Sequence, residues 1–216
     1  MISKRLQTIA EFVTKDKVVF DVGTDHALLP CFLVESGICD KVYAADIAIG
    51  PLNHAKETIK SHRLEGKVVP VLSDGLEKAG EDVDIVTISG MGFHTIKEIL
   101  DKKDLSGYER IILESNKDNN LLRQYLSDRN YTVIDETVVY DGFYYEIIVF
   151  NTDFHEKYSD LQIKYGPVNL AKREKEFIDY LKFRKSKLVS INEKACKMEY
   201  EKEINELSNL ISRIII

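Results

Sequence analysis

Short runs rich in valine and isoleucine alternate with helix-length segments through the first 150 residues of the chain. We expect five strands here, at residues 17–22, 41–46, 67–72, 84–89 and 110–114. We expect helices between and after them, at residues 27–36, 51–64, 94–102 and 119–128. The strand runs are apolar without clean alternation, which is typical of parallel strands buried on both faces. The pattern therefore predicts right-handed crossovers and an α/β fold built on a doubly wound sheet.

The pattern changes after Asn130. Residues 131–140 and 143–150 are two strand-like runs, and Asp141-Gly142 between them is a hairpin signal. Because no helix separates these two runs, we expect them to be antiparallel. A parallel sheet that ends in an antiparallel hairpin resembles the Rossmann-like sheet of class I methyltransferases more than that of dinucleotide dehydrogenases.

The last part of the chain, residues 169–216, contains neither glycine nor proline. Side chains that are mostly apolar recur there at spacings of three and four: Phe177, Leu181, Arg184, Leu188, Ile191, Ala195 and Met198, then Ile204, Leu207, Ile211 and Ile214. This spacing predicts two amphipathic helices that form an antiparallel coiled-coil hairpin, with a turn near residues 198–202. We therefore expect a sheet domain at residues 1–152 and a helical domain at residues 153–216.

The composition fits one medium domain with a modest appendage. The chain has 216 residues, 44% hydrophobic and 31% charged, which excludes a disordered chain. The mean hydropathy is −0.21 and no stretch has the apolar length of a membrane span, so we expect no membrane association. The N-terminus lacks the apolar block of a signal peptide and the three cysteines form no CxxC pair, so we expect a cytoplasmic protein. The five histidines show no metal-ligand spacing, and we expect no metal and a monomer.

Charge is unevenly distributed along the chain. The formal net charge is −6, which argues against a protein that simply coats nucleic acid. Residues 153–216, however, hold 13 Lys and Arg against 11 Asp and Glu, whereas residues 1–152 hold 17 against 25. Within residues 172–197 there are nine basic and four acidic side chains. A locally basic helix on an acidic body can still bind phosphate, although such charge runs are more often a solvated helix face.

Candidate ligand-binding residues follow the predicted strands. The first strand ends in a turn with a single glycine, Gly23, so the NAD(P) fingerprint GxGxxG is absent. Gly23 lets the backbone approach a ligand, and Asp25 is also a plausible cap of the next helix. Asp46 follows the glycine turn at the distance typical of an acid that binds ribose hydroxyls, and Asp74 is placed to reach an adenine amino group. Each acid alone also fits a turn or a cap, but three at consecutive strand ends suit a cationic cofactor without phosphate.

The fourth strand ends in Ser89-Gly90-Met91-Gly92-Phe93-His94. Two glycines open the backbone at the point where a donor and an acceptor of a transferred group meet. Phe93 could stack on a base, although an aromatic residue at a helix start is more often part of the core. His94 is more typical of a surface histidine than of a base.

Together these segments resemble one known family. GTDHALLP, DIAIGPL, SDGL and SGMG, at these spacings, are similar to the bacterial tRNA (adenine-22 N1)-methyltransferase family. The resemblance covers the chain to about Phe150, and the family's C-terminal coiled coil agrees with the predicted tail. It implies an S-adenosylmethionine-dependent enzyme that methylates N1 of an adenine in tRNA. Two departures are near the substrate side: Phe93 replaces a glycine, and Glu114-Ser115-Asn116 replaces Gln-Pro-Asn.

The resemblance and the residues together give a set of expected site residues. The expected cofactor contacts are Asp21, Gly23, Thr24, His26, Asp46, Ile47, Asp74, Gly75, Gly90, Met91 and Gly92. The expected catalytic residue is Asp25, which would accept a hydrogen bond or proton from the adenine amino group. The expected tRNA contacts are Phe93, Asn116, Lys182, Arg184, Lys185 and Lys187. Two alternatives stay open: a methyltransferase for another substrate, and an inactive adenosine-binding module whose coiled coil recruits a partner protein.

Overall fold

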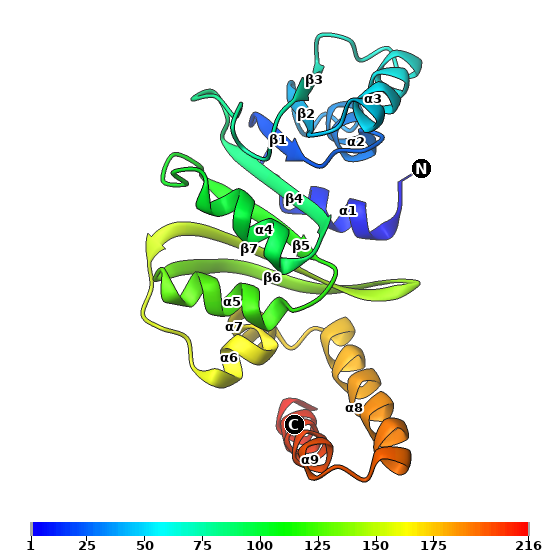
Figure 1. The fold of residues 1–216 in the computed structure, drawn as a ribbon, viewed down its shortest axis with the longest axis vertical. Coiled ribbons are helices and arrows are strands. Elements are labelled where there is room, and N and C mark those ends of the chain that lie inside the picture. The colour runs from blue at the N-terminus through cyan, green and yellow to red at the C-terminus, as the bar shows by residue number, and fades with distance from the viewer. Residues whose placement is uncertain (1, 216) are drawn as a thin grey trace.

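The computed structural model describes residues 2–215 and contains a seven-stranded sheet of order β3-β2-β1-β4-β5-β7-β6 (Figure 1). The strands are β1 (Val19–Val22), β2 (Val42–Asp46), β3 (Val68–Leu72), β4 (Ile85–Met91), β5 (Arg110–Ser115), β6 (Tyr131–Asp141) and β7 (Phe143–Phe154). β1 to β5 pair in parallel, whereas β7 is antiparallel to both β5 and β6. The predicted α/β sheet with an antiparallel terminal hairpin is confirmed.

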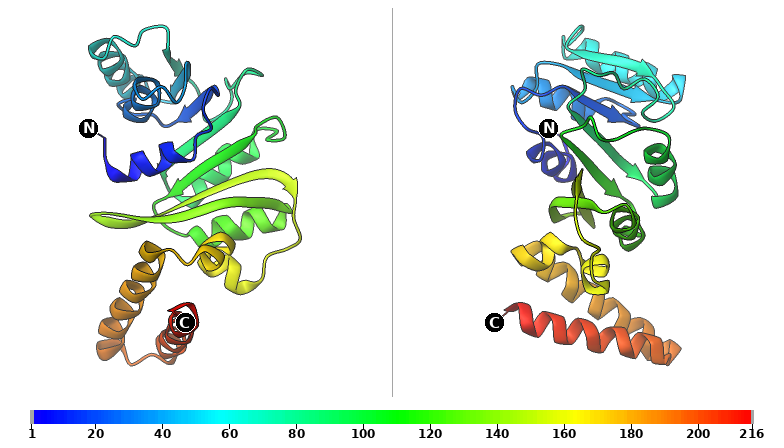
Figure 2. Two further views of the ribbon diagram at one scale, coloured as in Figure 1. Left: turned by 180° about the vertical axis from the view of Figure 1, so that it is seen from behind. Right: turned by 90° about the vertical axis from the view of Figure 1, so that its left-hand side faces the viewer.

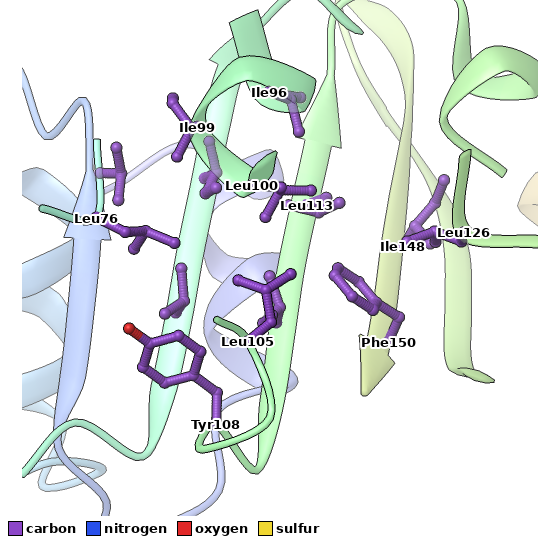
Figure 3. Close-up of a cluster of buried hydrophobic side chains, with 14 of the residues drawn as sticks. Leu76, Ile96, Ile99, Leu100, Leu105, Tyr108, Leu113, Leu126, Ile148 and Phe150 are labelled. Atoms are coloured by element: carbon purple, nitrogen blue, oxygen red, sulfur yellow. The ribbon is translucent and has the colours of Figure 1, made fainter. Parts of the chain in front are cut away.

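Helices cover both faces of the sheet. They are α1 (Lys4–Glu11), α2 (Leu28–Glu35), α3 (Ile49–Ser61), α4 (Phe93–Asp101), α5 (Asn119–Asp128), α6 (Asp160–Tyr165), α7 (Pro167–Lys172), α8 (Lys175–Ala195) and α9 (Met198–Ile215). α1, α2 and α3 bury apolar side chains on one face, and α4 and α5 bury theirs on the other, around Leu113, Ile148 and Phe150 (Figure 3). Within residues 2–215, no helix is both long and apolar enough to cross a lipid bilayer.

Several element boundaries differ from those expected from the sequence. The helices α1, α6 and α7, which have eight, six and six residues, were not predicted from the sequence. β4 continues through Gly90 to Met91, with a bulge at that point in its pairing with β5. The turn between α8 and α9 lies at Cys196 and Lys197, just before the expected residues 198–202. It forms there because Cys196 takes a left-handed conformation and Lys197 N donates to Asn192 Oδ1 at 2.7 Å.

The tail forms a helical hairpin that packs on the β6 edge of the sheet (Figure 1 and Figure 2). Its apolar cluster joins α8 and α9 to Val138 of β6. The buried tail side chains in that cluster are Tyr165, Phe177, Leu181, Leu207, Leu210 and Ile214. The predicted apolar stripe is wrong at the far end of the hairpin, where Ile191 is 42% and Met198 82% exposed, because that end projects away from the sheet.

A buried ion network connects α5, the β6–β7 hairpin and α7. Arg123 is fully buried, and its guanidinium donates to Glu136 Oε1 and to Glu146 Oε2, both at 2.6 Å. Glu136 Oε2 also accepts the Val168 N–H at 3.1 Å and the Asn169 N–H at 3.4 Å. Burial opposes the charge on Arg123, but the two carboxylates outweigh it and hold the pKa of Arg123 above its usual range.

Candidate active site

Strand order reverses between β1 and β4, and this places a crevice at their carboxyl ends. β1 leads into a turn whose Gly23 and Thr24 N–H groups both donate to Ala45 O of β2 at 2.9 Å. Gly23 has a φ of +74°, a left-handed conformation that favours glycine. A Cβ at this position would also clash with the Met91 side chain. The first glycine turn is therefore shaped by backbone conformation and by close packing of β4.

Two hollows meet at Gly23. One, of about 260 Å³, is bounded by Arg5, Gly23, Asp25, Leu29 and Gly90, and we call it the Arg5 hollow. The other, of about 230 Å³, is bounded on its polar side by Asp46 and Asp74 and on its apolar side by Ile47, Met91 and Ile99, and we call it the Ile99 hollow. Together they follow the carboxyl ends of β1, β2, β3 and β4.

Three expected cofactor residues are carboxylates at this edge. Asp46 is buried, and its Oδ1 accepts the Ala48 N–H at 2.9 Å, while its Oδ2 accepts the Asp25 N–H at 3.5 Å. Asp74 is exposed and pairs with Lys102, the C-cap residue of α4, at 2.8 Å. Asp21 is buried at the base of the Arg5 hollow, and burial raises its pKa to about 6 despite a hydrogen bond from Thr87.

The β4 turn is tied to the end of β5. Gly90 has a φ of +75°, and its N–H donates to Glu114 Oε2 at 2.9 Å. Its carbonyl accepts the Asn116 side-chain amide at 2.7 Å. Glu114 is fully buried, and its carboxylate pairs with the guanidinium of Arg5 on α1. The sequence did not indicate Arg5, because its helix was not predicted. Arg5 neutralises Glu114, the acid that stands in place of the glutamine in the family's Gln-Pro-Asn.

All but one of the remaining expected cofactor residues border the same two hollows; the exception is Gly92, which follows Met91. Thr24 and His26 border the Arg5 hollow, and Gly75 borders the Ile99 hollow. Gly92 is the N-cap residue of α4. Ile47, at the Ile99 hollow, is 68% exposed and offers an uncovered apolar side chain to a ligand. The fold thus brings the predicted cofactor set together at one edge of the sheet.

Asp25 lies on the wall of the Arg5 hollow with an exposed side chain and a φ of +48°. The expectation that it caps the next helix is wrong, because α2 starts after Ala27 in a left-handed conformation and has no side-chain cap. Asp25, His26 and His54 offer ligand atoms that lie within 4.8 Å of one another, and all three residues are exposed. Sequence spacing did not reveal this group, because His54 comes from α3 and meets His26 by ring stacking at 5.0 Å.

The expected tRNA contacts are dispersed. Asn116 borders the β4 turn, whereas Phe93, the first residue of α4, is partly buried against the apolar core. Arg184, an expected tRNA contact, is half-buried: its guanidinium lies over Tyr165 and Tyr180 and pairs with Glu203 of α9 at 2.9 Å. The lysines of this set lie on exposed or half-buried positions of α8: Lys182, Lys185 and Lys187.

Comparison with known proteins agrees with this geometry. The methyltransferase-domain family model matches residues 2–148. The tRNA (adenine(22)-N(1))-methyltransferase of Bacillus subtilis is 39% identical over 153 residues, which are 68% of this chain and 64% of that protein. The solved structure of M. capricolum TrmK, in complex with the cofactor product S-adenosyl-homocysteine, is 31% identical over 99% of this chain and 98% of that chain, with a TM-score of 0.80. The chain belongs to the tRNA (adenine-22 N1)-methyltransferase family. The structure of the B. subtilis m1A22 tRNA methyltransferase TrmK is 28% identical, covers 100% of this chain and 99% of that chain, and also has a TM-score of 0.80.

The two hollows fit the methyl donor of a tRNA (adenine-22 N1)-methyltransferase. The Ile99 hollow combines apolar side chains with the carboxylates of Asp46 and Asp74, which suits an adenine ring and ribose hydroxyls. The Arg5 hollow offers the guanidinium of Arg5, which already pairs with Glu114, and the open backbone of Gly90. A Cβ added at Gly90 would meet Arg5, at 3.8 Å. Neither hollow has the glycine-rich cradle of a diphosphate site, and the nearby acids disfavour phosphate.

Proposed function

We propose that the protein transfers a methyl group from S-adenosyl-L-methionine to N1 of adenine 22 in tRNA. The observation that carries this proposal is the pair of hollows that meet at Gly23, with a buried carboxylate at Asp46 and an open backbone at Gly90. Family membership supplies the target base. The relatives named above act on tRNA, and their activity is the basis for the proposed substrate.

The side chains of the crevice bind and orient the donor. Asp46 accepts hydrogen bonds from the ribose hydroxyls. Asp74 accepts one from the adenine amino group through one carboxylate oxygen, while Lys102 pairs with the other, Oδ2. Arg5 attracts the carboxylate of the methionine part, and Gly90 allows its close approach. When bound, S-adenosyl-L-methionine supplies an electrophilic methyl group on a sulfonium. The lone pair of adenine N1 would form a bond to that methyl carbon as the carbon–sulfur bond breaks and S-adenosyl-homocysteine leaves. The protein therefore mainly aligns N1, the methyl carbon and sulfur and excludes water.

Asp25 is the proposed catalytic residue. It lies on the wall of the Arg5 hollow, and its side chain is exposed and so accessible to an entering adenine. There it accepts a hydrogen bond from the N6 amino group. This group becomes more acidic as N1 is methylated, and Asp25 then takes its proton. Because N1 lies on the Watson–Crick edge, the base must leave its pair first, at a cost of about a few kcal/mol.

Methylation of defined transcripts tests this function. The wild-type protein is expected to methylate a tRNA transcript with adenine at position 22 and not one with guanine there. Asp25→Asn is expected to lower kcat about 100-fold, within the range for general base catalysis, with unchanged S-adenosyl-L-methionine affinity. Methyl transfer to a small molecule without tRNA would contradict the proposed substrate. Cofactor binding with no transfer to any RNA would contradict enzymatic activity.

Asp46→Ala is expected to weaken S-adenosyl-L-methionine binding. The variant loses a charged hydrogen-bond acceptor for the ribose, which costs about 1.5–3 kcal/mol and corresponds to a roughly 10- to 150-fold higher Kd. Calorimetry on the folded protein measures the change. Asp153→Ala, an exposed aspartate at the far end of β7, is the matched control and should bind normally. An unchanged Kd for Asp46→Ala would remove this residue from the site.

The lysines of α8 are proposed to bind the tRNA backbone. Reversal of Lys182, Lys185 and Lys187 to glutamate is expected to raise the KM for tRNA at least about tenfold and to reduce the salt dependence of binding. Arg184 is left intact, because its ion pair and ring contacts hold α8 to α9. The matched control reverses three exposed lysines elsewhere on the molecule: Lys15, Lys56 and Lys60. Equal tRNA affinity for both triple variants would assign the tail a structural role.

We propose that the chain divides into a methyltransferase domain at residues 1–152 and a helical domain at residues 153–216. The match of the methyltransferase-domain model to residues 2–148 supports this boundary. A separate apolar cluster in the tail also supports it. That cluster includes Val138 of β6, so the two parts share an apolar contact.

A further inference from the structure

A cavity of about 580 Å³ lies between α5, the β6–β7 hairpin and the helical tail. We call it the Tyr180 cavity, because Tyr144 of β7 and Tyr180 of α8 both line it. Its volume is within the usual range of about 300–1,000 Å³ for small-molecule sites. It is separate from the two hollows of the donor, but its wall includes Asn116, whose amide bonds the Gly90 carbonyl. One hydrogen bond therefore connects the cavity wall to the methyl-transfer turn.

Aromatic rings lead from the tip of the hairpin into this cavity. Tyr140 and Tyr144 are a cross-strand pair with ring centroids 5.0 Å apart. The Tyr144 ring then lies 5.4 Å from Tyr180 and 5.2 Å from Phe183, both on α8. Tyr140 is 52% and Phe183 is 47% exposed. We call these four residues the aromatic run, and its two ends are open to a flat ligand.

Strand direction places the aromatic run at the catalytic edge. β6 is parallel to β5, because each of them is antiparallel to β7, so its last residues lie at the carboxyl edge of the sheet. The Asp141 carboxylate at that tip accepts the Arg5 N–H at 3.0 Å, and Arg5 borders the donor hollow. Figure 1 and Figure 2 show the tip between α1 and α8. The run thus extends from beside the donor to the tail.

The polar groups of the cavity suit a neutral ring better than a phosphate. Four of its seven charged side chains are in ion pairs, since Glu146 pairs with Arg123, Arg184 with Glu203 and Lys164 with Glu206. The other three, Lys117, Asp118 and Asp160, carry a net negative charge, which disfavours phosphate. Amide side chains, which both donate and accept hydrogen bonds, fill much of the remaining lining: Asn116, Asn119, Asn120 and Gln124. Asn119 Oδ1 is buried without a hydrogen-bond partner within the described chain. Such groups match the edge of a nucleobase, and the aromatic run matches its face.

We propose that the aromatic run and the Tyr180 cavity bind an unpaired base of the tRNA strand that adjoins the target adenosine. This inference rests on the proposed function, because it is the displacement of the target base that leaves a neighbour unstacked. The neighbouring base stacks on Tyr140 and Tyr144 and directs its polar edge to the amides of α5. Stacking on the aromatic run offsets part of the cost of extracting the target. The residues named here position the substrate and do not take part in the chemical step.

Single substitutions at the hairpin test the proposal. Tyr140→Ala is expected to raise the KM for tRNA roughly 10- to 100-fold, with unchanged kcat and unchanged affinity for S-adenosyl-L-methionine. Tyr140→Phe keeps the ring and should behave as wild type. Two matched controls remove exposed aromatic rings outside the run and should have little effect. They are Phe143→Ala and Phe154→Ala. Phe143 precedes Tyr144 in β7, so its side chain is on the opposite face of the hairpin tip, and Phe154 is at the other end of β7.

A substrate change identifies the base that is bound. Transcripts carry an abasic site at the nucleotide 5′ or 3′ of the target, and one of the two is expected to raise the wild-type KM about tenfold. The same abasic site should add little in Tyr140→Ala, since the two changes remove one interaction. Additive effects, or equal losses for Tyr140→Ala and Phe143→Ala, would overturn the proposal. Failure of the proposed function differs, because the wild-type protein would then methylate no transcript.

Discussion

Replacing Gly23 by valine is expected to abolish methyl transfer and to weaken S-adenosyl-L-methionine binding at least about 100-fold, through backbone strain and lost ligand space together. The φ of +74° disfavours any β-branched residue, and the new Cβ meets the Met91 side chain. The branched methyl groups would also stand where the two hollows join. Calorimetry with S-adenosyl-L-methionine measures the loss.

Circular dichroism and a control variant separate this effect from misfolding. Gly107→Val is the matched control, because Gly107 has no atom within 4 Å of its added Cβ and its φ lies outside the left-handed region. It should bind the cofactor as wild type does. If folded Gly23→Val bound the cofactor with normal affinity, the donor would have to lie elsewhere than across this turn.

Arg123→Met is expected to lower the free energy of unfolding by about 3–5 kcal/mol, because it leaves two buried carboxylates without their cation. Glu136 and Glu146 both face this guanidinium at 2.6 Å. Urea unfolding followed by circular dichroism measures the difference. Arg129→Met removes an exposed partner of Asp101 from the end of the same helix and should cost about 1 kcal/mol or less.

The pH dependence of the Arg123→Met deficit provides a second readout. Burial already raises the pKa of Glu136 above its usual value of 4.5, and loss of the guanidinium raises it further. A carboxyl group with a raised folded-state pKa favours the folded state at low pH, and this contribution is lost as the pH rises through that pKa. The deficit should therefore shrink as the pH falls toward 4.5. A deficit of less than 1 kcal/mol at neutral pH would show that the network contributes little.

The sheet and the crevice at its carboxyl edge follow from local pattern, and this is why they were predictable. Each strand is a short apolar run, and topology brings the carboxyl ends of parallel strands to one edge. The acids at Asp46 and Asp74 could therefore be assigned to a common crevice from their positions along the chain alone. Their neighbour Arg5 could not, because α1 precedes the first strand and nothing in the sequence indicates that Arg5 reaches Glu114 at the end of β5.

The features that the sequence did not reveal depend on how distant elements dock. Arg184 lies near Tyr180 of its own helix, Tyr165 of α6 and Glu203 of α9, and the spacing along α8 cannot identify the two neighbours from other helices. The same is true of the Tyr180 cavity, whose walls come from α5, β7 and the tail. Periodicity identifies which face of a helix is buried but not what covers it, and sites between elements are therefore the hardest to predict.

β6 is an edge strand of eleven residues, and this position matters while the chain is being made. The ribosome releases the chain from the N-terminus, so β6 and β7 can pair before residues 175–215 have emerged. During that interval Val138 lacks its apolar cover, and a long strand edge is available to another nascent chain. The tail closes this edge once synthesis ends. The same helices that are proposed to recruit tRNA thus also bury apolar surface beside the edge strand, which the order of synthesis leaves uncovered for a time.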